Sequence, residues 1–214
     1  MNSTRLPGKV LREVNELPLV IHIYRRLLAC RELDGVSIAW GGEEGNLFES
    51  AKKYMIRYQI ANPEENLISR FLRCSIASHA DAFVRITADC LFHDPFYIDR
   101  MVRHYRDSYP QYRGLTNRYP TRTISEGLDA EIYSTELLAE LDRTPDCPRE
   151  GFAVYAEEKG LIAPFQPRTQ PLGQDLHLSI DTQEDFDRAE KMLKILGNDD
   201  WLYENTIRAY ELTK

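Results

Sequence analysis

Apolar positions along this chain switch repeatedly between a helical spacing and short continuous runs. Leu19, Ile23 and Leu27 belong to a set spaced three or four residues apart, which predicts a helix over residues 18–31. The β-branched run GVSIAW at residues 35–40 follows and is typical of a buried strand. The same patterns predict helices at 47–57, 66–79, 95–107 and from 181 onward, and strands at 82–87, 127–133 and 176–180. Strands that alternate with helices of this length predict an α/β fold with a mainly parallel sheet flanked by helices.

Composition narrows the class of protein. No repeat, low-complexity tract or linker divides the 214 residues, so we predict a single domain over 1–214, in which 198–214 form a C-terminal helical extension. The formal net charge of −7 argues against general affinity for a nucleic-acid backbone, and no stretch reaches the apolar length of a membrane span. The four cysteines form no CxxC pair, which indicates reduced thiols in a cytoplasmic protein. The five histidines lack metal-ligand spacing and are interpreted as structural or surface residues.

A short basic loop stands before the first predicted helix. In STRLPGKVL, at residues 3–11, Arg5 and Lys9 lie four residues apart, and Pro7 and Gly8 between them oppose a helix. The two cations can therefore converge on one anion, and an acidic protein suits a small polyphosphate better than a nucleic acid. The alternative is an ordinary basic N-terminal tail.

Two aspartates follow predicted strands and are candidate metal ligands. Asp89 comes after the strand at 82–87, and Asp181 comes after the strand at 176–180. Ligands bind at the carboxyl ends of strands in such a sheet, and two carboxylates together with substrate phosphate oxygens suit Mg²⁺. Each aspartate has a structural alternative, since Asp181 can be a helix N-cap and Asp89 can cap the turn before Pro95. The absence of a Walker A motif and of a GxGxxG motif disfavours the usual ATPase and dinucleotide-binding classes.

The stretch SEGLDAEIYS at residues 125–134 carries three carboxylates beside a glycine. Asp129 and Glu131 share one face of the predicted strand, and Glu126 lies close by. Like charges this close together favour a bound partner, and sugar hydroxyls are good donors to carboxylates. Asn117, just upstream, is placed to reach the same pocket. The alternative is a solvated edge strand whose charges protect against aggregation.

Four motifs, taken in order, resemble a known family. STRLPGK, RITADC, GLDAEIYS and SIDTQEDF resemble the cytidylyltransferases of the spore coat polysaccharide biosynthesis type, relatives of the acylneuraminate and 3-deoxy-manno-octulosonate cytidylyltransferases. The resemblance runs from Ser3 to about Leu196 and implies a nucleotide-diphospho-sugar transferase fold. It also implies a Mg²⁺-dependent enzyme that transfers CMP from CTP to a sugar or sugar acid for cell-surface polysaccharide, with release of pyrophosphate. The oligomeric state stays open, with a homodimer as one alternative.

The resemblance also suggests roles for individual residues. Arg5 and Lys9 match the catalytic loop that binds the triphosphate, and Asp89 and Asp181 match the Mg²⁺ ligands. Nucleotide contacts are expected at Ser3, Asn66 and Thr87. The sugar side is expected to comprise Asn117, Glu126, Asp129 and Glu131.

The chain departs from the family pattern at its start and at two pocket positions. Members begin with an apolar strand ending in QAR, whereas Met1-Asn2 stands directly before Ser3 here, so we expect a fold that lacks the usual first strand. We therefore expect the 214-residue chain to be poorly soluble or inactive alone, and the alternative function is a non-catalytic nucleotide- or sugar-binding relative, truncated at the N-terminus. Leu91-Phe92 replaces the usual Pro-Leu, and Gly151 replaces a histidine on the sugar side. A glycosyltransferase of related fold is disfavoured because ADC and DP supply no Asp-x-Asp metal motif.

Overall fold

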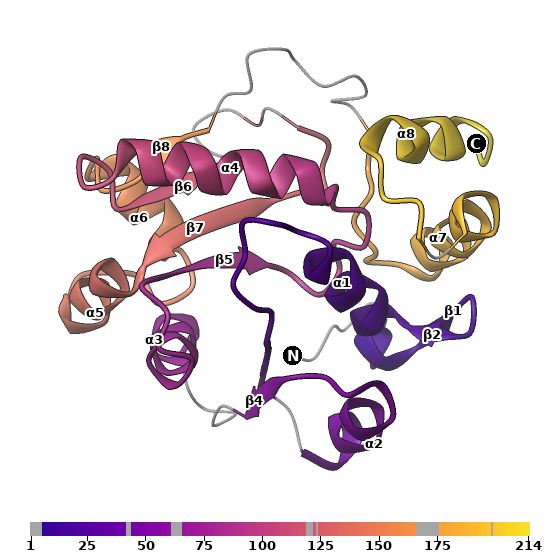
Figure 1. The fold of residues 1–214 in the computed structure, drawn as a ribbon, viewed down its shortest axis with the longest axis horizontal. Coiled ribbons are helices and arrows are strands. Elements are labelled where there is room, and N and C mark those ends of the chain that lie inside the picture. The colour runs from indigo at the N-terminus through magenta and orange to yellow at the C-terminus, as the bar shows by residue number, and fades with distance from the viewer. Residues whose placement is uncertain are drawn as a thin grey trace.

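The computed structural model describes residues 6–41, 44–60, 66–118, 122, 124–165, 176–197 and 199–214, which form helices around β-strands (Figure 1). The first half of the chain forms η1 (Lys9–Leu11), β1 (Glu13–Val14), β2 (Leu17–Pro18), α1 (Leu19–Leu28), β3 (Ile38–Trp40), α2 (Glu44–Tyr54), β4 (Tyr58–Ile60), α3 (Leu67–Ala77), β5 (Ala82–Ile86) and α4 (Pro95–Ser108). The second half forms β6 (Gly114–Thr116), β7 (Ala130–Ser134), α5 (Thr135–Arg143), α6 (Phe152–Glu158), β8 (Ala163–Pro164), α7 (Gln183–Leu196) and α8 (Tyr203–Glu211). The α/β prediction is confirmed, and each helix expected from the apolar spacing is present within a few residues of its expected bounds.

The four-stranded sheet is mixed, which corrects the expectation of a mainly parallel one. Its strand order is β5-β7-β6-β8, with β7 antiparallel to both neighbours and β6 parallel to β8. The reason is the short β6, which has only three residues and is joined to β7 by a connection whose described residues form no helix. An antiparallel neighbour needs no helical crossover, so the alternation of helices and strands did not reveal this pair.

The remaining strands form smaller ladders. β3 and β4 pair in parallel, and β1 and β2 form an antiparallel hairpin. Among the described residues, no ladder joins the β3–β4 pair to the four-stranded sheet. The segment 176–180, expected as the last strand, forms only two isolated bridges, from Ser179 to Cys90 and from His177 to Glu126.

Helices cover both faces of the four-stranded sheet (Figure 1). Alternate residues of β7 point to opposite faces, as a strand requires. Ala130 and Ile132 belong to a buried cluster with side chains of α4, whereas Tyr133 belongs to a cluster with side chains of α3, α5 and α6. Glu131 lies two residues before Tyr133 on β7 and therefore faces the same side of the sheet. This placement determines the surroundings of Glu131 described below.

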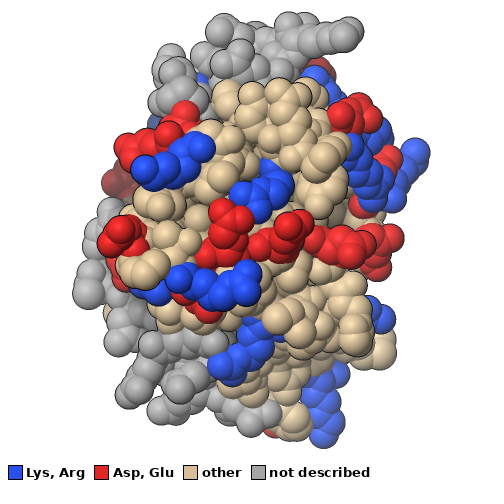
Figure 2. All heavy atoms as spheres, turned by 90° about the vertical axis from the view of Figure 1, so that its left-hand side faces the viewer, with Lys and Arg blue, Asp and Glu red and all other residues tan. Residues whose placement is uncertain are grey.

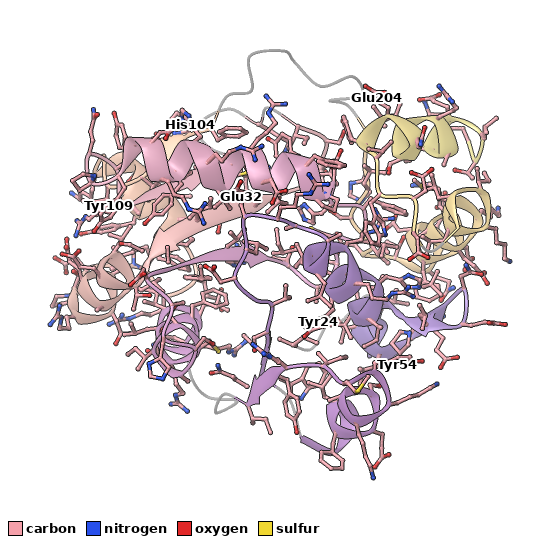
Figure 3. The ribbon with its side chains drawn as sticks, in the orientation of Figure 1. Tyr24, Glu32, Tyr54, His104, Tyr109 and Glu204 are labelled. Atoms are coloured by element: carbon pink, nitrogen blue, oxygen red, sulfur yellow. The ribbon has the colours of Figure 1, made fainter. Side chains whose placement is uncertain are left out.

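The loop after α1 is fixed to α4 by two carboxylates. Asp99 is buried in α4 and accepts hydrogen bonds from the backbone N–H groups of Arg31 and Glu32. Glu32 lies beside α4 (Figure 3). Its side chain pairs with Arg103 and Arg106 on the exposed face of that helix. These contacts hold the chain where it crosses from α1 to β3.

The surface carries charges of both signs. At the end of the molecule formed by α5 and the C-terminal part of α4, acidic and basic side chains are interleaved (Figure 2). The pair Arg113–Glu140 belongs to this region. Within the described part of the chain, no helix is both long and apolar enough to cross a membrane.

Candidate active site

Asp89 and Asp181 are brought together because two distant segments run side by side. The segment ending at Ile180 lies against the turn that follows β5, where Ser179 and Cys90 form an antiparallel bridge. The Ile180 N–H donates to the Asp89 carbonyl at 3.0 Å. The two carboxylates therefore lie together at one edge of the fold, as expected from the sequence, although 176–180 forms isolated bridges instead of a strand.

A glycine makes this arrangement possible. Leu178 N–H donates to the Glu126 carbonyl at 2.8 Å, so the segment 176–180 also crosses the chain just before β7. Gly127 has φ of 91°, and a Cβ atom there would lie 2.3 Å from the Ser179 nitrogen. Only glycine permits both the left-handed backbone and this close approach.

Lys9 lies between the two aspartates. Its ammonium donates to Asp89 Oδ2 at 3.0 Å, to Asp181 Oδ1 at 3.1 Å and to the Ile180 carbonyl at 2.7 Å. Gly8 precedes it with φ of 67°, which turns the basic loop so that Lys9 begins η1. Lys9 is only 8% exposed, so the cation is delivered into the fold instead of into solvent. The three side chains together keep one net negative charge.

The electrostatics of Asp89 follow from this contact. Burial raises the pKa of the Asp89 carboxyl, but the charge of Lys9 and hydrogen bonds from Thr87 and Lys9 outweigh burial and hold the pKa below its usual value. Asp89 is therefore a carboxylate over the whole physiological range. Its side chain remains 31% exposed and that of Asp181 23% exposed, so the pair is open to solvent on one side.

The helix-cap alternative for Asp181 is wrong, and Asp89 does not cap α4. Asp94, and not Asp89, is the N-cap of α4 and accepts from the Phe96 N–H at 2.8 Å. Thr182, and not Asp181, is the N-cap of α7 and forms a reciprocal capping box with Asp185. Both helix starts are satisfied without the two candidate metal ligands, and both of these carboxylates contact Lys9 instead.

The structure describes only some of the residues predicted to contact the nucleotide. Thr87 lies beside Asp89 and its hydroxyl contacts the Cys90 thiol at 2.9 Å. Asn66 is the N-cap of α3, with its side-chain oxygen accepting from Ser69 N–H at 3.1 Å. Ser3 and Arg5 lie outside the described residues. The nucleotide contacts of all four residues stay predictions.

The outer part of the predicted sugar side carries charged groups of both signs. Glu126 Oε2 lies 3.0 Å from His177 Nδ1, and Asp129 pairs with Arg122 and lies 3.8 Å from Arg118 Nε. Burial raises the pKa of Asp129 and outweighs the opposing effect of these arginines. His177 thus belongs to this charged surface, a role that its place in the sequence did not indicate.

The inner part of the predicted sugar side is engaged within the protein. Asn117 is 1% exposed, donates to the Leu128 carbonyl and accepts from the Ala130 N–H, both at 2.9 Å. Its amide therefore stabilises the start of β7, a role in the fold that sequence reasoning did not predict. A sugar contact by Asn117 stays a prediction.

Glu131 forms a buried ion pair across two strands. It is 2% exposed and accepts from Arg85 Nη1 at 2.7 Å and from the Tyr133 hydroxyl at 3.0 Å. Burial lowers the pKa of Arg85, but the Glu131 carboxylate outweighs burial and raises it overall. The signal for this pair was a lone cation in the apolar strand AFVRI, which needs an anionic partner when buried.

A family model described as cytidylyltransferase matches residues 1–212 of the chain. The chain belongs to the cytidylyltransferase family. It is 25% identical over 208 residues to the spore coat polysaccharide biosynthesis protein SpsF of Bacillus subtilis (strain 168), covering 92% of this chain and 84% of that protein. The resemblance seen in the four sequence motifs is thereby confirmed.

Solved structures agree with the cytidylyltransferase fold. A cytidylyltransferase from Leptospira borgpetersenii serovar Hardjo-bovis (strain JB197) superimposes with a TM-score of 0.86 at 26% identity, covering 99% of this chain and 90% of that one. A CMP:2-keto-3-deoxy-manno-octonic acid synthetase complexed with CTP superimposes with a TM-score of 0.67 at 16% identity, covering 89% and 93%. The predicted nucleotidyltransferase-like α/β fold is confirmed.

Proposed function

We propose that this cytidylyltransferase uses Mg²⁺ to transfer CMP from CTP to a sugar or sugar acid destined for cell-surface polysaccharide. In this reaction a substrate hydroxyl oxygen loses its proton to solvent and bonds to the α-phosphorus, the bond from that phosphorus to the oxygen bridging the α- and β-phosphates breaks, and pyrophosphate leaves with the bridging oxygen. The observation that carries the proposal is the convergence of Asp89 and Asp181 on the Lys9 ammonium, in a chain that matches the family over 1–212.

The donor set at this point fits Mg²⁺. The two carboxylate oxygens contact one ammonium nitrogen at 3.0 and 3.1 Å, so they already converge on a single cation. Two carboxylates with triphosphate oxygens completing the shell are the ligands that Mg²⁺ prefers. The ion would neutralise charge on the triphosphate and polarise its phosphorus–oxygen bonds. Asp89 and Asp181 would hold it.

The relatives support the substrate class. The name of the Bacillus protein places it in spore coat polysaccharide biosynthesis, and the synthetase of similar fold binds CTP and activates a sugar acid. Near the site, Glu126, His177 and Asp129 offer acceptors and donors for sugar hydroxyls. Four free cysteines without a disulfide support a cytoplasmic location.

The test is pyrophosphate release from the four nucleoside triphosphates, each with a panel of neutral sugars and sugar acids, with and without Mg²⁺. We expect turnover with CTP only, dependent on the metal and on one class of sugar. Asp89→Asn should abolish turnover with only a small fall in melting temperature, because asparagine can still accept from Lys9 and Asp181 keeps a negative charge beside it. The matched control is Asp107→Asn, an exposed carboxylate near the end of α4. CTP binding without pyrophosphate release from any sugar supports instead the non-catalytic relative.

A further inference from the structure

We infer that Lys9 is a resident counter-ion that occupies the Asp89–Asp181 pair in the nucleotide-free enzyme and is exchanged for the divalent cation only when a triphosphate binds. The inference rests on the proposed function and goes beyond it, because it couples metal binding to nucleotide binding through one side chain. It also changes the role expected for Lys9, which would bind the triphosphate in the loaded state alone.

The first step of the argument is the donor count of Lys9. An ammonium has three N–H groups and no acceptor. Lys9 directs its Nζ at three oxygens, with distances of 2.7, 3.0 and 3.1 Å to Ile180, Asp89 and Asp181. No N–H group remains for a phosphate while these contacts persist. Lys9 can therefore bind a triphosphate only by leaving the aspartates.

The second step concerns charge. A divalent cation that binds the same two carboxylate oxygens must approach within a few ångström of the Lys9 ammonium. Repulsion between charges of two and one at about 4 Å corresponds to about 2 kcal/mol in water, or about thirty-fold in affinity, and it grows at the lower dielectric of a buried site. Lys9 is only 8% exposed, so solvent screens it poorly. Lys9 and the metal thus compete for one pair of ligands.

The third step is that the site allows the exchange. The carboxylates of Asp89 and Asp181 keep 31% and 23% of their side-chain surface exposed, which opens the pair to solvent. Lys9 begins η1, a single turn of three residues after Gly8 in the left-handed region, so its unbranched side chain is held by few backbone constraints. Triphosphate oxygens are strong acceptors and replace those that Lys9 gives up. Nucleotide and metal binding must therefore be positively coupled.

The experiment measures Mn²⁺ binding by electron paramagnetic resonance of the free ion, with and without α,β-methylene-CTP, a non-reacting analogue. Lys9→Met is compared with wild type and with Lys191→Met, which removes an exposed cation of α7. Without the analogue, Lys9→Met should bind Mn²⁺ at least about ten-fold more tightly than both controls. The analogue should then raise Mn²⁺ affinity much less in Lys9→Met than in wild type. Equal or weaker Mn²⁺ binding by Lys9→Met overturns the inference and makes Lys9 a fixed clamp.

Two further observations keep the outcomes distinct. If wild type does not bind Mn²⁺ even with the analogue, the proposed metal-dependent function fails; if it does and Lys9→Met behaves like wild type, only the exchange fails. Should Lys9→Met not fold, the ¹⁵N signal of the Lys9 ammonium in wild type decides. That signal should be unchanged by Mg²⁺ alone and should shift when Mg²⁺ and the analogue are added together. A shift with Mg²⁺ alone, or no shift with both, contradicts the exchange.

Discussion

Replacing Glu131 with glutamine should destabilise the enzyme because it removes the counter-charge of a buried arginine. The carboxylate is 2% exposed and the Arg85 side chain 19% exposed, so little water can compensate for the lost charge. Glutamine preserves the shape and can still accept from the Tyr133 hydroxyl. Breaking a buried pair costs about 3–5 kcal/mol, and the partial exposure of Arg85 puts Glu131→Gln at about 3 kcal/mol. For a chain of this size that is a fall in melting temperature of about 6–12 °C.

The assay is urea unfolding followed by circular dichroism, together with pyrophosphate release. Glu140→Gln is the matched control, because Glu140 is 47% exposed and pairs with Arg113 on the surface, where such a change costs about 1 kcal/mol or less. Adding Arg85→Met to Glu131→Gln should recover stability, since no buried charge then remains unpaired. A loss below about 1 kcal/mol in Glu131→Gln, accompanied by weaker sugar binding, would refute this reasoning and restore Glu131 as a sugar ligand.

Two other predictions concern backbone geometry and protonation. Gly127→Ala should lower the free energy of unfolding in urea by about 3 kcal/mol or more, because its Cβ would lie 2.3 Å from the Ser179 nitrogen. Gly160→Ala, at a position with φ of 67° and no atom within 4 Å, should lower it by about 1 kcal/mol. Equal losses in the two variants contradict the close approach at Gly127. Burial, reinforced by the Arg26 charge, lowers the pKa of His93 to about 3, so only the unfolded chain takes up this proton as pH falls from about 6.5. This group should therefore lower the free energy of unfolding by up to about 1.4 kcal/mol for each pH unit of acidification below about 6.5. The free energy of unfolding of His93→Gln should fall less steeply with pH. Identical slopes for the variant and wild type contradict this assignment.

The aspartate pair could be predicted from the sequence because the signal for each aspartate is local. An apolar run predicts a strand, and the residue after the run is placed at the sheet edge whatever the neighbouring strands do. Asp89 lies three residues after β5 and Asp181 follows a segment that forms only isolated bridges, yet the structure brings the two together as expected. The sequence also predicted that Lys9 faces an anion, but it does not tell whether that anion is a bound phosphate or a carboxylate of the protein. Its carboxylate partners lie 80 and 172 residues away, and only the docked chain shows them.

The contacts of the predicted sugar-side residues were harder to predict from the sequence, because they depend on strand pairing. Three carboxylates in SEGLDAEIYS have the same sequence signature whether they face solvent, arginines or a ligand. Glu131 opposes Arg85 only because β7 runs antiparallel to β5 in this register, and a mainly parallel sheet would have separated the two residues. Asn117 likewise gains its backbone partners from the return of the chain between β6 and β7.

The long sequence separations at the aspartate pair have a consequence for how the enzyme comes into being. Contacts between residues far apart in the chain form late, because closing a long loop costs entropy before any contact repays it. Lys9 meets Asp181 across 172 residues, and the hydrogen bond from Ile180 to Asp89 must form for both carboxylates to be present together. A chain that is still emerging during synthesis therefore has no carboxylate pair until the segment at 176–181 has docked. The metal site that the proposed function assigns to this pair therefore requires that the segment at 176–181 has docked.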